Sequence, residues 1–206
     1  MAHSDEAEKY SAAAFATKHE DAIYFSKRVT RAVPDGGPIE AHTDLVKKLD
    51  YECELAVVLG RDARDVPAGQ TRDYIFGYTI LNDVSARDVQ TAHKQWYFGK
   101  SLDGFTPIGP CIVTADAFAD YPPRLGIRSF VNGGKRQDSN TALQIFDIDH
   151  VIAELSQGMT LKAGTIIATG TPAGVGMGMD PPQFLKPGDV VRCEIEGIGT
   201  LTNPVK

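Results

Sequence analysis

Two glutamates lie inside a stretch of sequence that otherwise reads as a buried β-strand. Residues 51–60 run Tyr-Glu-Cys-Glu-Leu-Ala-Val-Val-Leu-Gly. Alternate residues of a strand share a face, so the side chains of Glu52 and Glu54 project together, about 6–7 Å apart along the strand. Both faces of the remaining stretch are apolar, unlike those of a strand with one solvated face. The chain must therefore fold so that two carboxylates stand at the edge of its core.

The two glutamates need a compensating positive charge if the strand is buried. Carboxylate oxygens are hard ligands, and a site built from them suits Mg²⁺, Mn²⁺ or Ca²⁺ better than Zn²⁺. The histidines of the sequence are not spaced as zinc ligands with another His or Cys. The alternative is a hydrated strand end in which water solvates both carboxylates.

A second polar cluster follows the next predicted strand, at residues 74–81. The sequence Asn-Asp-Val-Ser-Ala-Arg-Asp-Val-Gln at 82–90 is typical of a helix start. Asp83, Arg87 and Gln90 then stand at i, i+4 and i+7, which places a carboxylate, a guanidinium and an amide on one helix face. By themselves Asp83 and Arg87 are more typical of an ordinary ion pair on a surface helix, so their significance depends on the glutamates.

The rest of the chain reads as short strands separated by turns. Strands are expected near 22–27, 51–60, 74–81, 108–114, 127–132, 165–169, 190–196 and 199–202. One helix is predicted at 149–157, where Gly158 can end it, and high helix propensity predicts another at 5–19. Residues 99–110 are rich in Gly and Pro and predict an ordered loop with Lys100 near its front. We therefore expect an α+β protein that is β-rich, with few short helices.

Composition excludes several classes of function. The 206 residues are enough for one sizeable core and predict a single domain. A net charge of −6 argues against nucleic acid or an anionic membrane as a partner, and no apolar run approaches the ~20 residues of a membrane span. The first twenty residues are too polar for a signal peptide. Cys53, Cys111 and Cys193 each lie in an apolar stretch and read as small core residues of a cytoplasmic protein.

Taken together, these stretches resemble the fumarylacetoacetate hydrolase family. The matching motifs are Glu-Cys-Glu at 52–54, Asn-Asp-Val-Ser-Ala-Arg-Asp-Val-Gln at 82–90, Gly-Lys-Ser at 99–101 and the stretch containing Thr-Gly-Thr-Pro at 164–176. The similarity runs from about Phe25 to the C-terminus, in the family's order of motifs. It implies a catalytic domain built as a mixed-sheet β-roll over residues 25–206, preceded by a lid or helical segment at 1–24.

The resemblance also implies a set of site residues and a cofactor. The expected metal ligands are Glu52, Glu54 and Asp83, the substrate-binding residues Arg87, Gln90 and Thr171, and the catalytic residues His3, Glu6 and Lys100. The implied cofactor is Mg²⁺ or Mn²⁺, with Ca²⁺ as a further option. The family is usually dimeric, so a homodimer is expected.

The group that activates water is expected at the N-terminus. Several family members carry a His-x-x-Glu pair on a short segment that covers the substrate, and His3-Ser-Asp-Glu6 has this spacing. The Asn-Tyr stretch that usually precedes this His is missing, so an exposed terminal His without a role is the alternative. A second departure is Lys27-Arg28, where the family commonly has Lys-Pro.

The charges of these residues indicate the chemistry that the site supports. The three carboxylates, a divalent cation, Arg87 and Lys100 leave a small positive charge, which favours a small anionic 2-oxo acid. The metal would polarise the 2-oxo carbonyl and stabilise an enolate, while His3, assisted by Glu6, would deprotonate water for attack on the distal carbonyl. We therefore expect hydrolysis of a C–C bond in an acylpyruvate or a fumarylacetoacetate-like β-diketo acid.

Three alternatives stay open. Without an effective water-activating pair, the same residues could decarboxylate oxaloacetate, or isomerise or hydrate a 2-oxo-enoic acid. The family contains all of these activities. A candidate from another class is a catalytically weak relative that binds metal and oxo acids without turnover.

Overall fold

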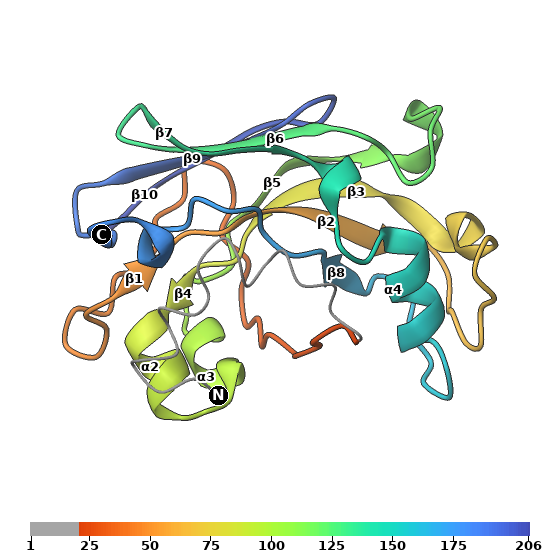
Figure 1. Ribbon diagram of the computed structural model, residues 1–206, viewed down its shortest axis with the longest axis horizontal. Coiled ribbons are helices and arrows are strands. Elements are labelled where there is room, and N and C mark those ends of the chain that lie inside the picture. The colour runs from red at the N-terminus through yellow and green to blue at the C-terminus, as the bar shows by residue number, and fades with distance from the viewer. Residues whose placement is uncertain (1–20) are drawn as a thin grey trace.

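Two four-stranded sheets form the centre of the computed structural model, which describes residues 21–206 (Figure 1). One sheet has the strand order β5-β3-β2-β8 and the other β10-β9-β6-β7. The strands of the first are β2 (Cys53–Leu59), β3 (Ile75–Asn82), β5 (Ile108–Thr114) and β8 (Ile166–Ala168). Those of the second are β6 (Gly126–Val131), β7 (Gly134–Asn140), β9 (Val190–Ile195) and β10 (Gly199–Pro204). A short pair consists of β1 (Leu49–Asp50) and β4 (Ser85–Ala86).

The two sheets pack against each other, and β2 lies at the centre of the core. This strand is buried along its whole length because β3 and β8 flank it while β6 and β9 contact its face (Figure 1). All pairings between the named strands are antiparallel. Within the described residues, the parallel part of the predicted mixed sheet is limited to isolated bridges at Val33–Pro107 and Ile39–Val205. The antiparallel pairing brings the start of β2 beside the end of β3.

Within residues 21–206 the helices are few and short, as predicted. They are α2 (Arg87–Ala92), α3 (Trp96–Lys100) and α4 (Ile148–Leu155), with 3-10 turns η2 (Thr71–Tyr74), η3 (Ala115–Ala117), η4 (Thr141–Leu143) and η5 (Gly176–Gly178). Asp147 caps α4 by accepting the backbone N–H of His150 at 2.8 Å. No helix within residues 21–206 is both long and apolar enough to cross a membrane. The β-rich α+β fold class with short helices is confirmed.

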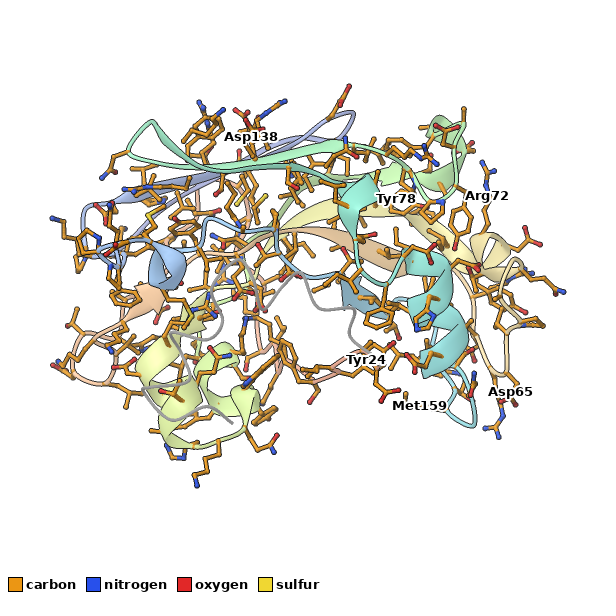
Figure 2. All side chains as sticks on the ribbon, in the orientation of Figure 1. Tyr24, Asp65, Arg72, Tyr78, Asp138 and Met159 are labelled. Atoms are coloured by element: carbon orange, nitrogen blue, oxygen red, sulfur yellow. The ribbon has the colours of Figure 1, made fainter. Side chains whose placement is uncertain are left out.

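One predicted strand is absent from the structure, and one observed strand of the main sheets was not predicted. Residues 22–27 form no strand, because this segment is held by side chains rather than by a backbone ladder; the Tyr24 hydroxyl, for example, contacts Glu154 of α4 (Figure 2). Strand β7 was not predicted, since its polar sequence lacks an apolar alternation. It forms because Asn132 and Gly133, both with positive φ, turn the chain back along β6.

Three further predictions fail around the second polar cluster and the cysteines. Helix α2 begins at Arg87 rather than near Asp83, because the intervening Ser85 and Ala86 pair with β1. Lys100 ends α3 instead of lying in a loop. Cys111 is exposed on β5, unlike the other two cysteines, which are buried. The predicted helix at 5–19 and nearly all of the predicted segment 1–24 lie outside the described residues.

Candidate active site

Glu52, Glu54 and Asp83 meet where the start of β2 lies beside the end of β3. The register pairs Cys53 with Asn82, and the backbone N–H of Asp83 donates to the Glu52 carbonyl at 2.8 Å. Each of the three side chains offers a carboxylate oxygen that lies within 4.8 Å of the others, and all three residues are buried. In an octahedral shell with metal–oxygen bonds of 2.0–2.3 Å, ligand oxygens are about 3–4.6 Å apart. The trio is therefore assembled at a spacing close to that of a cation shell.

Glu54 is the carboxylate of this trio that most lacks a counter-charge. Its Oε2 accepts the backbone N–H of Gly170 at 2.8 Å, and no lysine or arginine of the described chain forms an ion pair with it. Burial, followed by repulsion from Asp83 and Glu52, raises the pKa of Glu54 well above its ordinary value. A buried, unpaired carboxylate beside two others is the donor set that a divalent cation satisfies, so these residues fit such an ion.

Two lysines enter the acidic cluster from different segments. Lys100 Nζ donates to Glu52 Oε2 at 2.8 Å and to Asp83 Oδ2 at 2.6 Å. Lys27 Nζ donates to Asp83 Oδ1 at 2.8 Å. Burial would lower the pKa of Lys100, but Glu52 and Asp83 outweigh it and raise that pKa, whereas burial prevails at Lys27 and lowers its pKa. In this arrangement the two ammonium groups place positive charge in direct contact with Glu52 and Asp83.

Arg87 lies behind Glu52 at the start of α2. Its Nη1 is 2.7 Å from Glu52 Oε1 and donates to Gln90 Oε1 at 3.3 Å, while its Nε donates to Asp50 Oδ2 at 2.9 Å. Burial would raise the pKa of Glu52, but Lys100 and Arg87 together lower it to about 2. Asp83 thus joins this group from an extended segment and not, as predicted, from the same helix face as Arg87.

The hydroxyl of Thr171 forms hydrogen bonds within the protein. It donates to the Cys53 carbonyl at 3.0 Å and accepts Gln137 Nε2 at 2.7 Å. The buried Gln137 also donates to the Pro172 carbonyl at 2.7 Å and accepts the Cys53 N–H at 3.1 Å. These bonds fasten the loop that follows β8 to the strand that carries the glutamates, and they bring the Gly170 N–H to Glu54. A substrate contact by Thr171 has to use its remaining acceptor or its main chain.

The structure thus brings together the predicted residues Glu52, Glu54, Asp83, Arg87, Gln90 and Lys100, with Thr171 on the adjoining loop. His3 and Glu6 lie outside the described residues, and their dyad stays a prediction. Sequence reasoning missed Lys27, Asp50 and Gln137. The sequence could have indicated Asp50 as a site residue, because it continues the alternation of Glu52 and Glu54 by two residues. It gave no such indication for Gln137, since the strand that carries Gln137 was not predicted.

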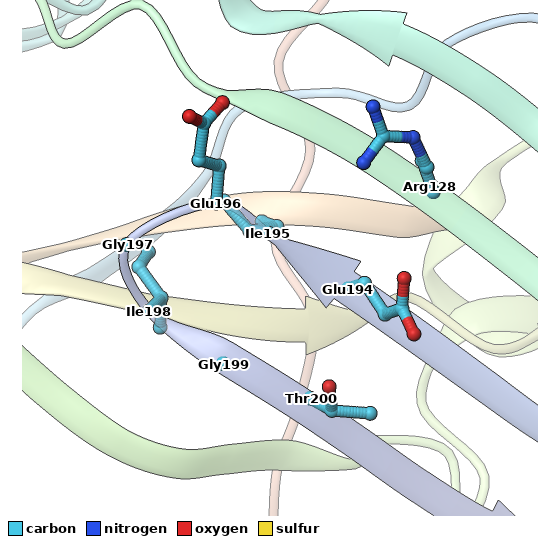
Figure 3. Close-up of a pocket in the computed structure, with 8 residues that line it drawn as sticks. All are labelled: Arg128, Glu194, Ile195, Glu196, Gly197, Ile198, Gly199 and Thr200. Carbon is cyan, nitrogen blue, oxygen red and sulfur yellow. The ribbon is translucent and has the colours of Figure 1, made fainter.

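An open depression of 810 Å³ elsewhere on the surface does not coincide with this cluster. It lies at the β9–β10 hairpin, where Arg128, Glu194 and Glu196 surround residues 197–200 (Figure 3). None of the predicted site residues lines it. The buried carboxylates, and not this charged and hydrated hairpin, are therefore the candidate site.

The fold and the cluster define a β-rich protein with three buried carboxylates that could bind one divalent cation. Residues 1–206 match the family described as fumarylacetoacetate (FAA) hydrolase C-terminal, and the chain belongs to this family. The predicted family resemblance is confirmed. Members of this family generally use a divalent metal.

Two relatives are similar in sequence to most of this chain. An uncharacterised protein of Staphylococcus saprophyticus is 47% identical over 179 residues, which cover 87% of this chain and 59% of that protein. Oxaloacetate tautomerase YisK of Bacillus subtilis is 44% identical over 186 residues, which cover 90% of this chain and 62% of YisK. The chain therefore spans about three fifths of the length of these relatives.

Solved structures agree with the fold. The fumarylacetoacetate hydrolase EaFAH from the psychrophilic Exiguobacterium antarcticum has a TM-score of 0.88 and 46% identity, covering 100% of this chain and 71% of its own. The 2-hydroxyhepta-2,4-diene-1,7-dioate isomerase from Mycobacterium marinum has a TM-score of 0.80 and 44% identity, covering 90% and 69%. The names of these similar proteins include a hydrolase, an isomerase and a tautomerase.

Proposed function

We propose that this chain forms an oxo-acid active site that interconverts the keto and enol forms of a small 2-oxo dicarboxylate such as oxaloacetate. The observation that supports it is the Lys100 ammonium lying between Glu52 and Asp83, at the edge of a buried acidic trio. A Mg²⁺ or Mn²⁺ ion held by Glu52, Glu54 and Asp83 would polarise the 2-oxo carbonyl and stabilise the enolate. Lys100 would then stand beside the oxygen on which negative charge develops.

Lys100 is also a candidate proton carrier for this reaction. Glu52 and Asp83 raise its pKa and hold it as an ammonium in the metal-free protein. Placed beside the substrate, its amine and ammonium forms could exchange a proton between the carbon next to the carbonyl and the enol oxygen. Tautomerisation requires this proton transfer and no attack by water.

Charge and free donors favour an anionic substrate. Asp50, Glu52, Glu54 and Asp83 face three cationic side chains, those of Lys27, Lys100 and Arg87, so a divalent cation would leave the cluster positively charged. The Nη2 group of Arg87 forms no hydrogen bond to the described residues, and it can donate to a substrate carboxylate together with the amide of Gln90.

Hydrolysis of a C–C bond in an acylpyruvate or a fumarylacetoacetate-like acid is the second candidate, favoured by the similarity to EaFAH. It needs a base that activates water. Within residues 21–206, His42 contacts the Asp103 carbonyl at 2.8 Å, His93 packs on Phe98, and His150 pairs with Glu154. None of these histidines contacts the acidic trio. This activity therefore depends on His3 and Glu6.

Parallel assays of the purified chain with Mg²⁺ or Mn²⁺ test the two candidates. One follows the loss of the enol absorbance of oxaloacetate, and the other follows pyruvate release from acylpyruvates and from oxaloacetate. We expect metal-dependent acceleration of the first without pyruvate release, and its loss in Glu52→Ala but not in the exposed control Asp138→Asn. Pyruvate release from an acylpyruvate that disappears in His3→Ala would establish hydrolysis instead. Binding of oxalate without any turnover would indicate a catalytically weak relative.

The assembly is a separate proposal. The family resemblance favours a homodimer. Light scattering at micromolar concentration should give twice the chain mass, and a monomer mass would contradict it.

A further inference from the structure

Lys27 joins three separate segments of the chain beside the acidic trio. Its Nζ donates to Asp83 Oδ1 at 2.8 Å, to the Val84 carbonyl at 3.3 Å and to the Lys100 carbonyl. Its side chain is only 12% exposed. An ammonium has three N–H bonds and a neutral amine has two, so three acceptors match the charged form. A buried cation with all its donors engaged fixes the positions of its partners.

The first partner is the carboxylate of Asp83, whose two oxygens are divided between two lysines. Lys27 holds Oδ1, and Lys100 holds Oδ2 at 2.6 Å. With Oδ1 tied to the segment that precedes the core, the carboxylate cannot rotate freely, and Oδ2 stays on the Lys100 ammonium that also contacts Glu52. A cation that takes the place of this ammonium would then meet only one oxygen of Asp83.

The second partner is the last residue of α3. The Lys100 carbonyl is one of the four carbonyls at a helix end that lack a partner within the helix, and Lys27 supplies that partner. This bond fixes the backbone from which the Lys100 side chain extends to Glu52. One ammonium therefore acts on both a candidate cation ligand and the candidate proton carrier.

We propose that Lys27 is a positioning residue that holds Asp83 as a one-oxygen ligand of the cation and orients Lys100. This inference rests on the proposed function, since it presumes the cation site. If Lys27 acted through its charge alone, its replacement would change the cation affinity in the opposite direction. Removing a positive charge near the trio would strengthen cation binding, whereas releasing Asp83 from its fixed orientation weakens it. Loss of a group that orients a metal ligand typically costs 10–100-fold in metal affinity.

The experiment measures the affinity of the full chain for Mn²⁺ alone, by calorimetry or by the electron paramagnetic resonance signal of free Mn²⁺ at fixed ionic strength. Lys27→Met keeps the length of the side chain and removes its charge. We expect binding at least about 10-fold weaker. Lys27→Arg keeps the charge, but its planar fork cannot reproduce three converging bonds, so we expect an intermediate loss. The matched control Lys135→Met removes an exposed lysine and should leave the affinity unchanged.

The outcomes separate this inference from the proposed function. Unchanged or tighter Mn²⁺ binding in Lys27→Met overturns the positioning role and leaves the cation site intact. Absence of Mn²⁺ binding by the unmodified protein overturns the cation site and the inference together. Thermal melting without metal shows whether Lys27→Met folds. If it does not, Lys27→Arg decides, because wild-type affinity in that variant overturns the proposal and weaker binding supports it.

Discussion

The acidic cluster at the start of β2 and the ion pairs of the β6–β7 hairpin bring the same residue types together in opposite environments. In the cluster, the side chains of Lys100 and Asp83 are each only 3% exposed. On the hairpin, Arg128 and Lys135 both pair with Asp138, and these side chains are 43–54% exposed (Figure 2). Water screens the second group and not the first.

The pKa directions show what this difference means. On the hairpin, Lys135 and Arg128 lower the pKa of Asp138, which is the ordinary result of an exposed pair. In the cluster, the pKa of Glu52, which directly precedes β2, and that of Glu54, which lies in β2, shift in opposite directions. Burial raises the pKa of Glu54, whereas Lys100 and Arg87 overcome burial and lower that of Glu52 to about 2. The buried region thus contains a carboxyl group that lacks a cationic partner in the described chain and that a divalent cation could hold in its charged form, whereas the exposed region does not.

The largest expected contrast is in stability. Glu52→Gln leaves the buried Lys100 and Arg87 without their shared partner, and breaking a buried ion pair from one side typically costs 3–5 kcal/mol. We expect a loss of about this size in the free energy of unfolding of the metal-free protein. Urea denaturation with a fitted m-value measures it. A midpoint equal to that of the unmodified protein would mean that water, or the remaining carboxylates Asp83 and Asp50, satisfies the two cations, and the contrast with the hairpin would fail.

A smaller loss is expected at Asp50, which is fully buried behind Arg87. Its carboxylate accepts Arg87 Nε at 2.9 Å and the backbone N–H groups of Gly176 at 2.7 Å and Met177 at 3.0 Å. Asp50→Asn keeps one acceptor but loses the charge, so the unfolding free energy should fall by about 1.5–3 kcal/mol. Because Arg87 is then held only through its Nη1 contacts with Glu52 and Gln90, KM for the oxo acid should rise more than kcat falls. A change in kcat alone would argue against this positioning effect.

The residues of the acidic cluster also show how much of the site the sequence could predict. Glu52, Glu54 and Asp83 were predicted because short motifs carry them, and their contact follows from antiparallel pairing of two strands that the apolar pattern predicts. Lys27 and Gln137 could not be predicted in this way. Their partners are 56 and 34 residues away in sequence. The segment of Lys27 was predicted as a strand that does not form, and the polar segment of Gln137 lacks an apolar alternation. Such contacts depend on tertiary packing and not on local propensity.

The prediction of where α2 begins was wrong for a related reason. Asn82 to Ala86 has good helix-start chemistry, but pairing of Ser85 and Ala86 with β1 keeps this stretch extended until Arg87. Backbone pairing with a distant strand outweighed local capping. The prediction of a β-rich fold class was correct despite such errors, because it depends on the long apolar strands 53–59 and 75–82 more than on the position of any one boundary.

A third prediction concerns Glu54, where we expect a change in stability opposite in sign to that at Glu52. Glu54 has a raised pKa in the metal-free protein, so folding takes up a proton there, and the stability associated with it is lost as pH rises through the folded-state pKa. Glu54→Gln should therefore stabilise the chelator-treated protein, increasingly above about pH 4.3, the ordinary pKa of glutamate. With Mn²⁺ present, the unmodified protein should gain stability that the variant does not. Equal melting temperatures across this pH range without metal would contradict the reading of Glu54 as an uncompensated carboxylate.

The smallest change in stability is expected for a substitution on the β6–β7 hairpin. Asp138→Asn removes the partner of both Arg128 and Lys135, as Glu52→Gln removes the partner of Lys100 and Arg87. Because all three hairpin side chains are hydrated, the two cations lose little when the carboxylate is gone. We expect an unchanged urea midpoint, unchanged Mn²⁺ affinity and no dependence of the difference on salt. A destabilisation as large as that of Asp50→Asn would show that screening by water is not what separates the two regions, and the argument for a cation at the buried cluster would lose its physical basis.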